Sequence, residues 1–256
     1  MPAVRNGSGP VLRFLRISAL GLLLSTASAA SILDSALDAY LNGQPEQTIR
    51  LLTGRTDAPS LALLARAYGV EASLAPLPAE RQKLARTSEE QARTALAADA
   101  SNADAHIELG NALAFQLTGA NVFQAVGVGT EIRRQYERAV QLDPAAARGW
   151  VGLGIWHAQA LALGPVLAFA SGASEGQMRA NHRRAVELQP NEVFFRLSYA
   201  DSLLLLADHD ARRALALRQE ARSVLLEALK VRPLTYWQRL DQDQVRERLK
   251  LLNALP

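Results

Sequence analysis

A nine-residue motif, YERAVQLDP at residues 136–144, recurs along the chain. Related stretches are HRRAVELQP (182–190), LLEALKVRP (225–233) and the less regular ARTALAADA (92–100). Their starts at 92, 136, 182 and 225 give periods of 44, 46 and 43 residues. Self-similarity at a period of this length is typical of stacked helical repeats, in which each unit buries its apolar face against its neighbours.

Two positions of the motif indicate how each unit is built. The fourth position is alanine in every copy, namely Ala95, Ala139, Ala185 and Ala228. A small side chain at this point lets two helices approach closely. The ninth position is proline in three of the four copies, and proline cannot continue a helix. The motif therefore predicts the closing helix of each repeat and the point where it ends.

A second pattern begins six residues after each motif and predicts the opening helix of the next repeat. A large residue comes first, followed by an apolar residue, a glycine or alanine, and a bulky residue, at i, i+3, i+4 and i+7, which is one face of a helix. The copies are His106, Leu109, Gly110, Leu113; Trp150, Leu153, Gly154, His157; and Arg196, Tyr199, Ala200, Leu203.

These two patterns together resemble the tetratricopeptide repeat (TPR). The resemblance rests on Trp150-x-x-Leu153-Gly154 in the opening helix and on Tyr136-x-x-Ala139 with Pro144 in the closing helix. It implies an all-α, right-handed superhelical stack of antiparallel helix pairs with a concave binding groove. The units depart from the family in length, because each carries about ten residues more than the usual 34.

The whole chain after residue 29 reads as one repeat domain, 30–256, with about eleven or twelve helices. Residues 31–100 predict degenerate helix pairs, 101–233 the clearer repeats, and 234–256 a capping helix with charged residues on its outer side. Within the degenerate part, helices are expected at 32–41, 48–52, 60–70 and 80–98, with residues 76–78 as a connection.

Residues 1–29 have the pattern of a cleavable signal peptide. Three arginines precede an apolar run at 17–24, and small residues at 27–29 follow it. An uncleaved N-terminal anchor is the alternative, whereas no later stretch is long and apolar enough to cross a membrane. The chain has no cysteine, which excludes lipid attachment at a mature N-terminal cysteine. We expect a periplasmic or secreted protein that is not a lipoprotein.

Composition and motifs argue against several classes of function. The net charge of +3 equals the three arginines of residues 1–30, so the remaining chain is near neutral and lacks the basic character of nucleic-acid-binding proteins. No catalytic, cofactor-binding or metal-binding motif is present, and His106, His157 and His182 occupy repeat positions that otherwise hold packing residues. We therefore expect a protein without enzymatic activity, cofactor or metal.

Two uncharged apolar segments, residues 115–130 and 161–172, exceed what a minimal helix pair needs. They either pack internally, form a surface for a ligand or partner, or contact a membrane. If Phe123, Trp156 and Phe169 lie together, they form an apolar pocket between repeats. These three aromatic residues are the candidate site for a partner or ligand.

Two functions fit this sequence. The first is a non-enzymatic adaptor or scaffold of the cell envelope that holds a protein or peptide on its concave side. The second is an accessory protein that binds an apolar small molecule through the inserted segments. A signal followed by long TPR-like pairs is weakly similar to the periplasmic T components of TRAP-type transporters, which implies assembly with a solute-binding protein.

Overall fold

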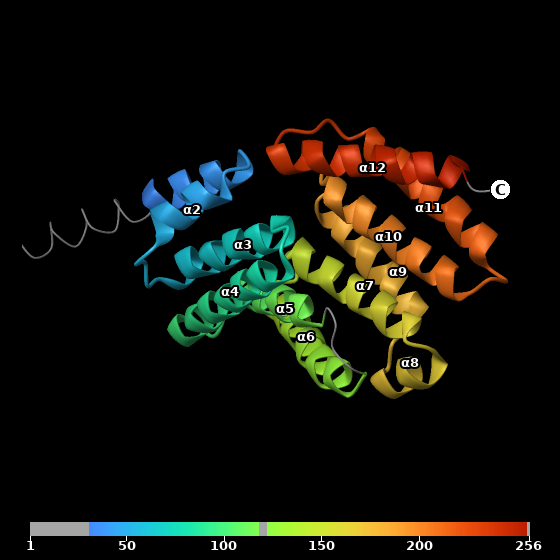
Figure 1. Cartoon of the computed structure of the whole chain (residues 1–256), viewed down its shortest axis with the longest axis horizontal. Helices are drawn as coiled ribbons and strands as arrows, with labels where there is room; N and C mark the ends of the chain where they lie inside the picture. The colour runs from blue at the N-terminus through green and yellow to red at the C-terminus, as the bar shows by residue number, and fades with distance from the viewer. Residues whose placement is uncertain (1–30, 118–121, 255–256) are drawn as a thin grey trace, which may run out of the picture.

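The computed structural model describes residues 31–117 and 122–254, without the side chains of residues 116 and 122–126. All regular structure in these residues is α-helical (Figure 1), which confirms the all-α solenoid. A helix at residues 31–41 is followed by α2 (Pro45–Leu52), α3 (Ala58–Leu74), α4 (Pro78–Ala98), α5 (Ala103–Gln116), α6 (Val122–Leu142), α7 (Ala147–Ala162), α8 (Pro165–Ser171), α9 (Glu175–Leu188), α10 (Val193–His209), α11 (Ala214–Leu229) and α12 (Tyr236–Ala254).

The helices pack as successive pairs that stack along the molecule. The pairs are α3 with α4, α5 with α6, α7 with α9, and α10 with α11, and the opening helices α3, α5, α7 and α10 also contact one another in that order. The short helix α8 is inserted between α7 and α9 and packs against α7. The last helix, α12, covers α10 and α11 (Figure 1).

The recurring spacing of small and large residues explains how the pairs close. All four alanines of the motif are fully buried. The motif's first residue packs onto a glycine of an opening helix. A Cβ added at Gly110 would lie 2.7 Å from the Tyr136 ring, and one at Gly154 would lie 2.7 Å from the His182 ring. Because these glycines have no side chain, the aromatic ring of the closing helix packs directly on the backbone of the opening helix.

The first residue of the opening-helix pattern forms a hydrogen bond to the turn before the helix, a role that its size does not predict. His106 Nε2 lies 3.1 Å from the carbonyl oxygen of Ala100, and Trp150 Nε1 donates to that of Pro144 at 3.0 Å. Arg196 Nη1 donates to the carbonyl oxygen of Pro190 at 2.6 Å. All three carbonyls belong to the last residue of the preceding motif, so what the three side chains share is a nitrogen that bonds the turn between helices.

Helix boundaries follow ordinary capping chemistry, with one departure from expectation. Asp57, Asn102 and Ser174 each accept a hydrogen bond from a backbone N–H in the first turn of α3, α5 and α9. Pro78 was expected in a connection, but it is the first residue of α4. Proline is well suited to that position because the first helical N–H has no partner within the helix.

The two ends of the stack meet. Trp237 Nε1, from α12, donates to the carbonyl oxygen of Tyr40 at 2.6 Å, and the two rings lie 5.6 Å apart. Gly43 has a positive φ of 77°, and an added Cβ would lie 2.3 Å from the Tyr236 ring. Only glycine fits there, because the backbone is left-handed and the ring occupies the side-chain space. The N-terminal helix therefore rests against the start of α12 (Figure 1).

The predicted signal peptide, residues 1–29, lies outside the described residues. Among the residues described, none of the helices is both long enough and apolar enough to span a membrane.

Candidate functional site

The three aromatic residues singled out from the sequence have different surroundings. Trp156 in α7 is buried, and its Nε1 donates to the carbonyl oxygen of Gly129 at 2.7 Å. Phe169 in α8 is 89% exposed, and Leu163 and Val166 nearby are exposed as well. Phe123 belongs to α6, but its side chain lies outside the described residues. Trp156 is thus a core residue, and Phe169 belongs to an exposed apolar face of α8.

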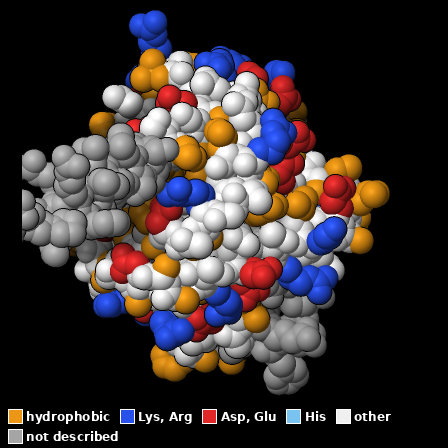
Figure 2. All heavy atoms as spheres, turned by 90° about the vertical axis from the view of Figure 1, so that its left-hand side faces the viewer, with side chains coloured by type: hydrophobic (Ala, Val, Ile, Leu, Met, Phe, Trp, Pro, Cys, Tyr) orange, Lys and Arg blue, Asp and Glu red, His pale blue; other side chains and the backbone are white. Residues whose placement is uncertain are grey.

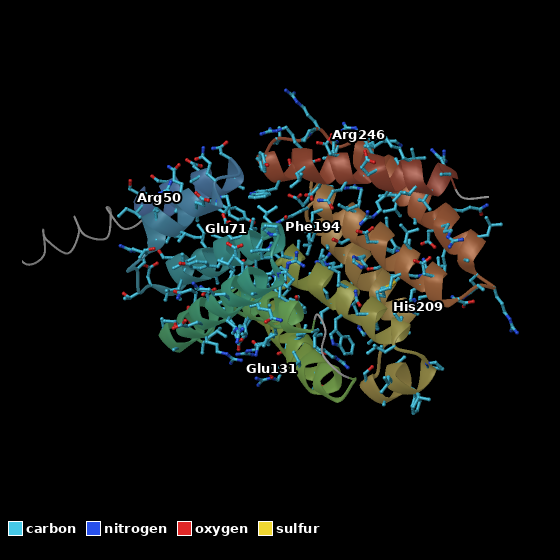
Figure 3. All side chains as sticks on the ribbon, in the orientation of Figure 1. Arg50, Glu71, Glu131, Phe194, His209 and Arg246 are labelled. Carbon is cyan, nitrogen blue, oxygen red and sulfur yellow. The ribbon has the colours of Figure 1, made fainter. Side chains whose placement is uncertain are left out.

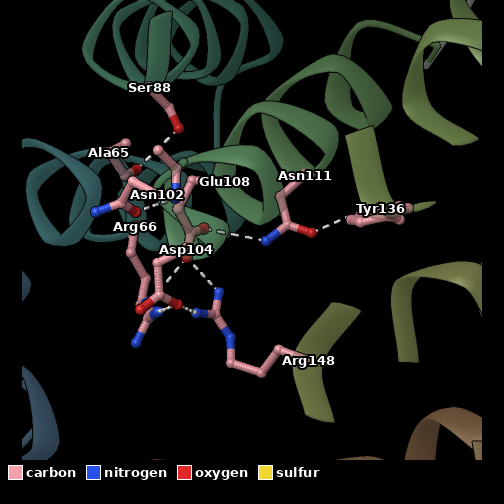
Figure 4. Close-up of polar contacts among 10 residues, drawn as sticks. Ala65, Arg66, Ser88, Asn102, Asp104, Glu108, Asn111, Tyr136 and Arg148 are labelled. Atoms are coloured by element: carbon pink, nitrogen blue, oxygen red, sulfur yellow. Dashed lines mark hydrogen bonds and ion pairs between the residues drawn. The ribbon is translucent and has the colours of Figure 1, made fainter. Parts of the chain in front are cut away.

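A charged network joins the opening helices of three successive repeats (Figure 4). Arg66 of α3 donates to Glu108 at 2.8 Å and to Asp104 at 2.7 Å, both on α5. Arg148 of α7 donates to Asp104 at 3.1 Å and also bonds Glu108. Two guanidinium groups and two carboxylates satisfy each other here, so the network fixes α3, α5 and α7 relative to one another.

Glu108 is the centre of this network. Its side chain is 3% exposed, and its second oxygen accepts from Asn111 at 3.0 Å, which in turn accepts from the Tyr136 hydroxyl at 2.7 Å. Burial raises the pKa of Glu108, and the Arg66 guanidinium opposes that rise. Burial also raises the pKa of Tyr40 to about 12, with Arg66 again opposing, since its guanidinium lies 5.8 Å from the Tyr40 ring.

The network borders a row of equivalent positions that solvent can reach. The starts of the motif place Asp104, Arg148 and Phe194 at the same register in α5, α7 and α10. The Asp104 and Arg148 side chains are 59% and 29% exposed, and Phe194 is 41% exposed. Phe194 lies in the first turn of α10, at the end of that helix nearest α12 (Figure 3). We call Asp104, Arg148 and Phe194 the inner row.

Acidic residues lie at the α12 end of this row. Glu192, the N-cap of α10, accepts from Gln238 of α12 at 3.1 Å. Asp241 is half-buried on the same helix, and burial, followed by the charge of Glu192, raises its pKa to about 7. The inner row therefore changes from a balanced pair of charges to an aromatic ring beside carboxylates.

The outer surface carries mixed charge. Figure 2, which views the α2 to α4 end of the stack, shows Lys and Arg side chains interspersed with Asp and Glu. Ion pairs one helical turn apart are frequent, as between Arg93 and Glu89 or Arg134 and Glu131. This face therefore concentrates neither sign of charge.

Sequence reasoning missed the network and the inner row. One signal was available, since Glu108 directly precedes Leu109 and Gly110 of the opening-helix pattern, where a charge has to be buried or paired. Its partners are 42 and 40 residues away, at Arg66 and Arg148, so the pairing depends on how the repeats stack.

Comparison with known proteins supports the fold. The chain matches no protein-family model and no curated protein sequence. It is similar to TTC0263, a thermophilic TPR protein of Thermus thermophilus, at 16% identity and a TM-score of 0.60, over 85% of this chain and 98% of that one. It is also similar to PilF of Pseudomonas aeruginosa, at 18% identity and a TM-score of 0.50, over 87% of each chain.

The chain therefore has the TPR-like helical repeat fold that the motif predicted. The weaker similarity to the T components of TRAP-type transporters gains no support from these comparisons.

Proposed function

We propose that this chain is a non-enzymatic adaptor of the cell envelope, exported by its N-terminal signal, which holds a protein or peptide partner along the inner row. The single observation that carries the proposal is the inner row itself. Three opening helices present solvent-accessible side chains at one register: the Arg66–Glu108–Arg148 network ties α5 and α7 together, and α7 packs against α10. A rigid row of this kind suits an extended chain, because successive repeats contact successive residues of the partner.

The chemistry of the row indicates what such a partner offers. Phe194 provides an apolar anchor, and Arg148 and Asp104 provide one charge of each sign. Exposed aromatic and arginine side chains are the residue types that contribute most to protein interfaces. Export rests on the pattern of residues 1–29, and cleavage of that signal would release the repeat domain into the periplasm or medium.

Site-specific photo-crosslinking tests the adaptor function. A photoreactive phenylalanine analogue replaces Phe194, and in separate variants Phe169 or Arg86, which is exposed on α4. Irradiation of the producing cells should yield a discrete protein adduct at position 194 and none at position 86. The adduct is identified by mass spectrometry and reproduced with the purified partner. Absence of an adduct at 194, or turnover of a substrate by the purified protein, would reject the proposal.

A second function, small-molecule binding, is favoured by a different observation. A cleft of about 400 Å³ lies beside Trp156, lined by α6, α7, α9 and Gly172. Phe169 is not among its lining residues, and most of the polar side chains there are amides or charged groups. A ligand of this cleft would therefore be polar, in contrast to the apolar ligand expected from the inserted segments.

A further inference from the structure

The cleft lies between two closing helices, α6 and α9, over the opening helix α7. We call this place the open junction. Its lining residues include both apolar and hydrogen-bonding side chains. The apolar ones are Val140, Trp150 and Leu153, and the hydrogen-bonding ones are Arg133, Glu137, Gln141, His157, Gln177 and Asn181. Its volume of about 400 Å³ falls within the range of small-molecule sites.

In the next repeat the equivalent junction is bridged by direct side-chain contacts. We call the packing of α9 and α11 over α10 the closed junction. Counting from the motif starts, Arg179 there corresponds to Arg133, Glu220 to Gln177, and Tyr199 to Leu153. Arg179 bonds the Glu220 carboxylate directly, and the Tyr199 hydroxyl donates to the same carboxylate at 3.0 Å. The chain thus supplies a carboxylate to this arginine from its own next helix.

The open junction retains the arginine and lacks that carboxylate, because Gln177 stands in place of Glu220. Arg133 is held by its own surroundings: Nε donates to Glu137 at 2.7 Å, Nη1 donates to the carbonyl oxygen of Ser171 at 2.8 Å, and the guanidinium lies 5.0 Å from the Trp156 ring. Its remaining nitrogen, Nη2, has no hydrogen-bond partner among the described residues. The arginine is therefore oriented, with one nitrogen, Nη2, free to donate.

Two buried polar side chains of the cleft also lack partners. His157 and Asn181 are each only 5% exposed. His157 Nδ1 accepts from the backbone N–H of Ser174 at 3.3 Å, so the proton of the neutral ring lies on Nε2, for which the described residues provide no acceptor. The Asn181 side chain makes no hydrogen bond with the described residues. Neither donor atom is among the fully buried, unpartnered atoms of the described residues, so both reach the solvent of the cleft and are available to a ligand that displaces water there.

Electrostatics keep His157 a neutral donor. Burial, followed by the nearby charge of Arg133, lowers its pKa to about 4. The cleft therefore combines the free Nη2 of a fixed guanidinium, a neutral imidazole N–H, an amide and several apolar side chains.

We propose that the open junction binds a small-molecule carboxylate, whose carboxylate group accepts a hydrogen bond from Nη2 of Arg133. Arginine binds carboxylates in a planar arrangement with defined geometry, which favours a carboxylate over a spherical anion. His157 and Asn181 donate to the bound group, and its short apolar part packs on Leu153 and Val140. This site is separate from the inner row and does not depend on the adaptor function.

The probe is butanoate, with uncharged butanamide as the matched ligand control. The ¹⁵N-labelled mature protein is titrated while the Trp156 indole N–H and the Arg133 Nε–H signals are followed by NMR. Arg133 lines the cleft, and the Trp156 ring lies 5.0 Å from its guanidinium, so both signals report on an occupant that binds Arg133. We expect saturable shifts with butanoate and none with butanamide.

Two variants copy the closed junction into the open one. Gln177→Glu provides Arg133 with an internal carboxylate, and it should weaken butanoate binding at least about tenfold, which corresponds to about 1.4 kcal/mol. Asn181→Val copies the counterpart Val224, removes a donor without adding charge, and should also weaken binding. Gln244→Glu on the exposed side of α12 adds the same charge elsewhere and should leave binding unchanged.

Thermal unfolding of each variant verifies that it is folded. If Gln177→Glu does not fold, butanoate binding by Asn181→Val tests the proposal instead. The absence of saturable shifts with butanoate overturns the proposal, as does wild-type affinity in the folded cleft variants.

Discussion

The open and closed junctions have the same backbone plan and differ in how an arginine is satisfied. In the closed junction Arg179 pairs with Glu175 on its own helix and also with Glu220 across the repeat boundary, and the Tyr199 hydroxyl lies beside it. In the open junction Gln177 and Leu153 leave a cleft, and Arg133 pairs with Glu137 on its own helix. Two substitutions between equivalent positions thus change a packed boundary into a potential site, while the helices around it stay alike.

The largest loss of stability is expected at the position where the open junction has a glycine and the closed junction an alanine. Gly154→Ala gives the open junction the alanine that Ala200 provides in the closed one, but its Cβ would meet the His182 ring at 2.7 Å. Because a buried aromatic ring cannot move aside, we expect a loss of about 3 kcal/mol in unfolding free energy, measured with urea. In the control Gly69→Ala, the nearest atom would lie at 3.6 Å, and a gain of up to about 1 kcal/mol is expected.

The second prediction concerns pH. His182 faces the Ser202 hydroxyl at 2.9 Å, and burial lowers its pKa from 6.5 to about 3, whereas the closed junction holds Leu225 at this position. Below pH 6.5 His182 is protonated in the unfolded chain, whereas in the folded chain it stays neutral down to about pH 3. The free energy of unfolding therefore falls as the pH falls through this window. Above pH 6.5 the titration of His182 adds nothing to its pH dependence.

Between about pH 6 and about pH 4.5 this proton accounts for about 2 kcal/mol. His182→Leu should remove that part of the pH dependence, as measured by urea unfolding at both pH values. His157, whose pKa is lowered to about 4, and Asp241, whose pKa is raised to about 7, also titrate here, so the comparison is between variant and wild type. Equal pH dependence of the two proteins would contradict the prediction.

A third substitution removes the internal carboxylate of the closed junction. Glu220→Gln replaces the carboxylate that Arg179 and the Tyr199 hydroxyl share with a neutral amide, which weakens the bond to the arginine. Both side chains of the ion pair are partly exposed, at 20% and 35%, so solvent screening limits the expected loss to about 1 kcal/mol. Differential scanning calorimetry measures it, with Glu247→Gln on exposed α12 as the control expected to change little. A loss no greater than that of the control would show that Glu220 adds no stability.

The smallest effect is expected at α8, which the open junction has and the closed one lacks. Phe169 is 89% exposed, so Phe169→Asp should change the unfolding free energy by less than about 0.5 kcal/mol. It should also leave butanoate binding unaltered, because Phe169 does not line the cleft. Loss of butanoate binding in a folded Phe169→Asp protein would instead place the ligand beside α8.

The register of the repeats could be predicted in detail, because burying an alanine or ending a helix at a proline is a local requirement that each copy repeats. The four motif alanines are buried, and α6 and α9 contain the motif at the predicted place. The role of His106, Trp150 and Arg196 in bonding the preceding turn was harder to predict from the sequence. Their size indicated packing, whereas the property they share is a side-chain nitrogen that bonds the preceding turn.

The candidate sites could not be predicted to the same extent. Alignment of the motifs shows that Gln177 stands where the other repeats have Glu131 and Glu220. The alignment does not show that Gln177 lies near Arg133, a residue of the preceding repeat. The pocket predicted from Phe123, Trp156 and Phe169 assumed that the two inserted apolar segments meet at Trp156, between the repeats. Trp156 is instead buried in the core and Phe169 is exposed to solvent, because α8 turns outward after Gly164.

The sequence by itself determined the class of structure, since helix periodicity, small contact residues and terminal prolines are properties of short segments and recur with each repeat. Only the tertiary structure decided which charges pair. Arg66 meets Glu108 across 42 residues, and Trp237 meets Tyr40 across 197. Contacts of this range depend on the small rotation between successive repeats, which accumulates along the stack and brings its two ends together.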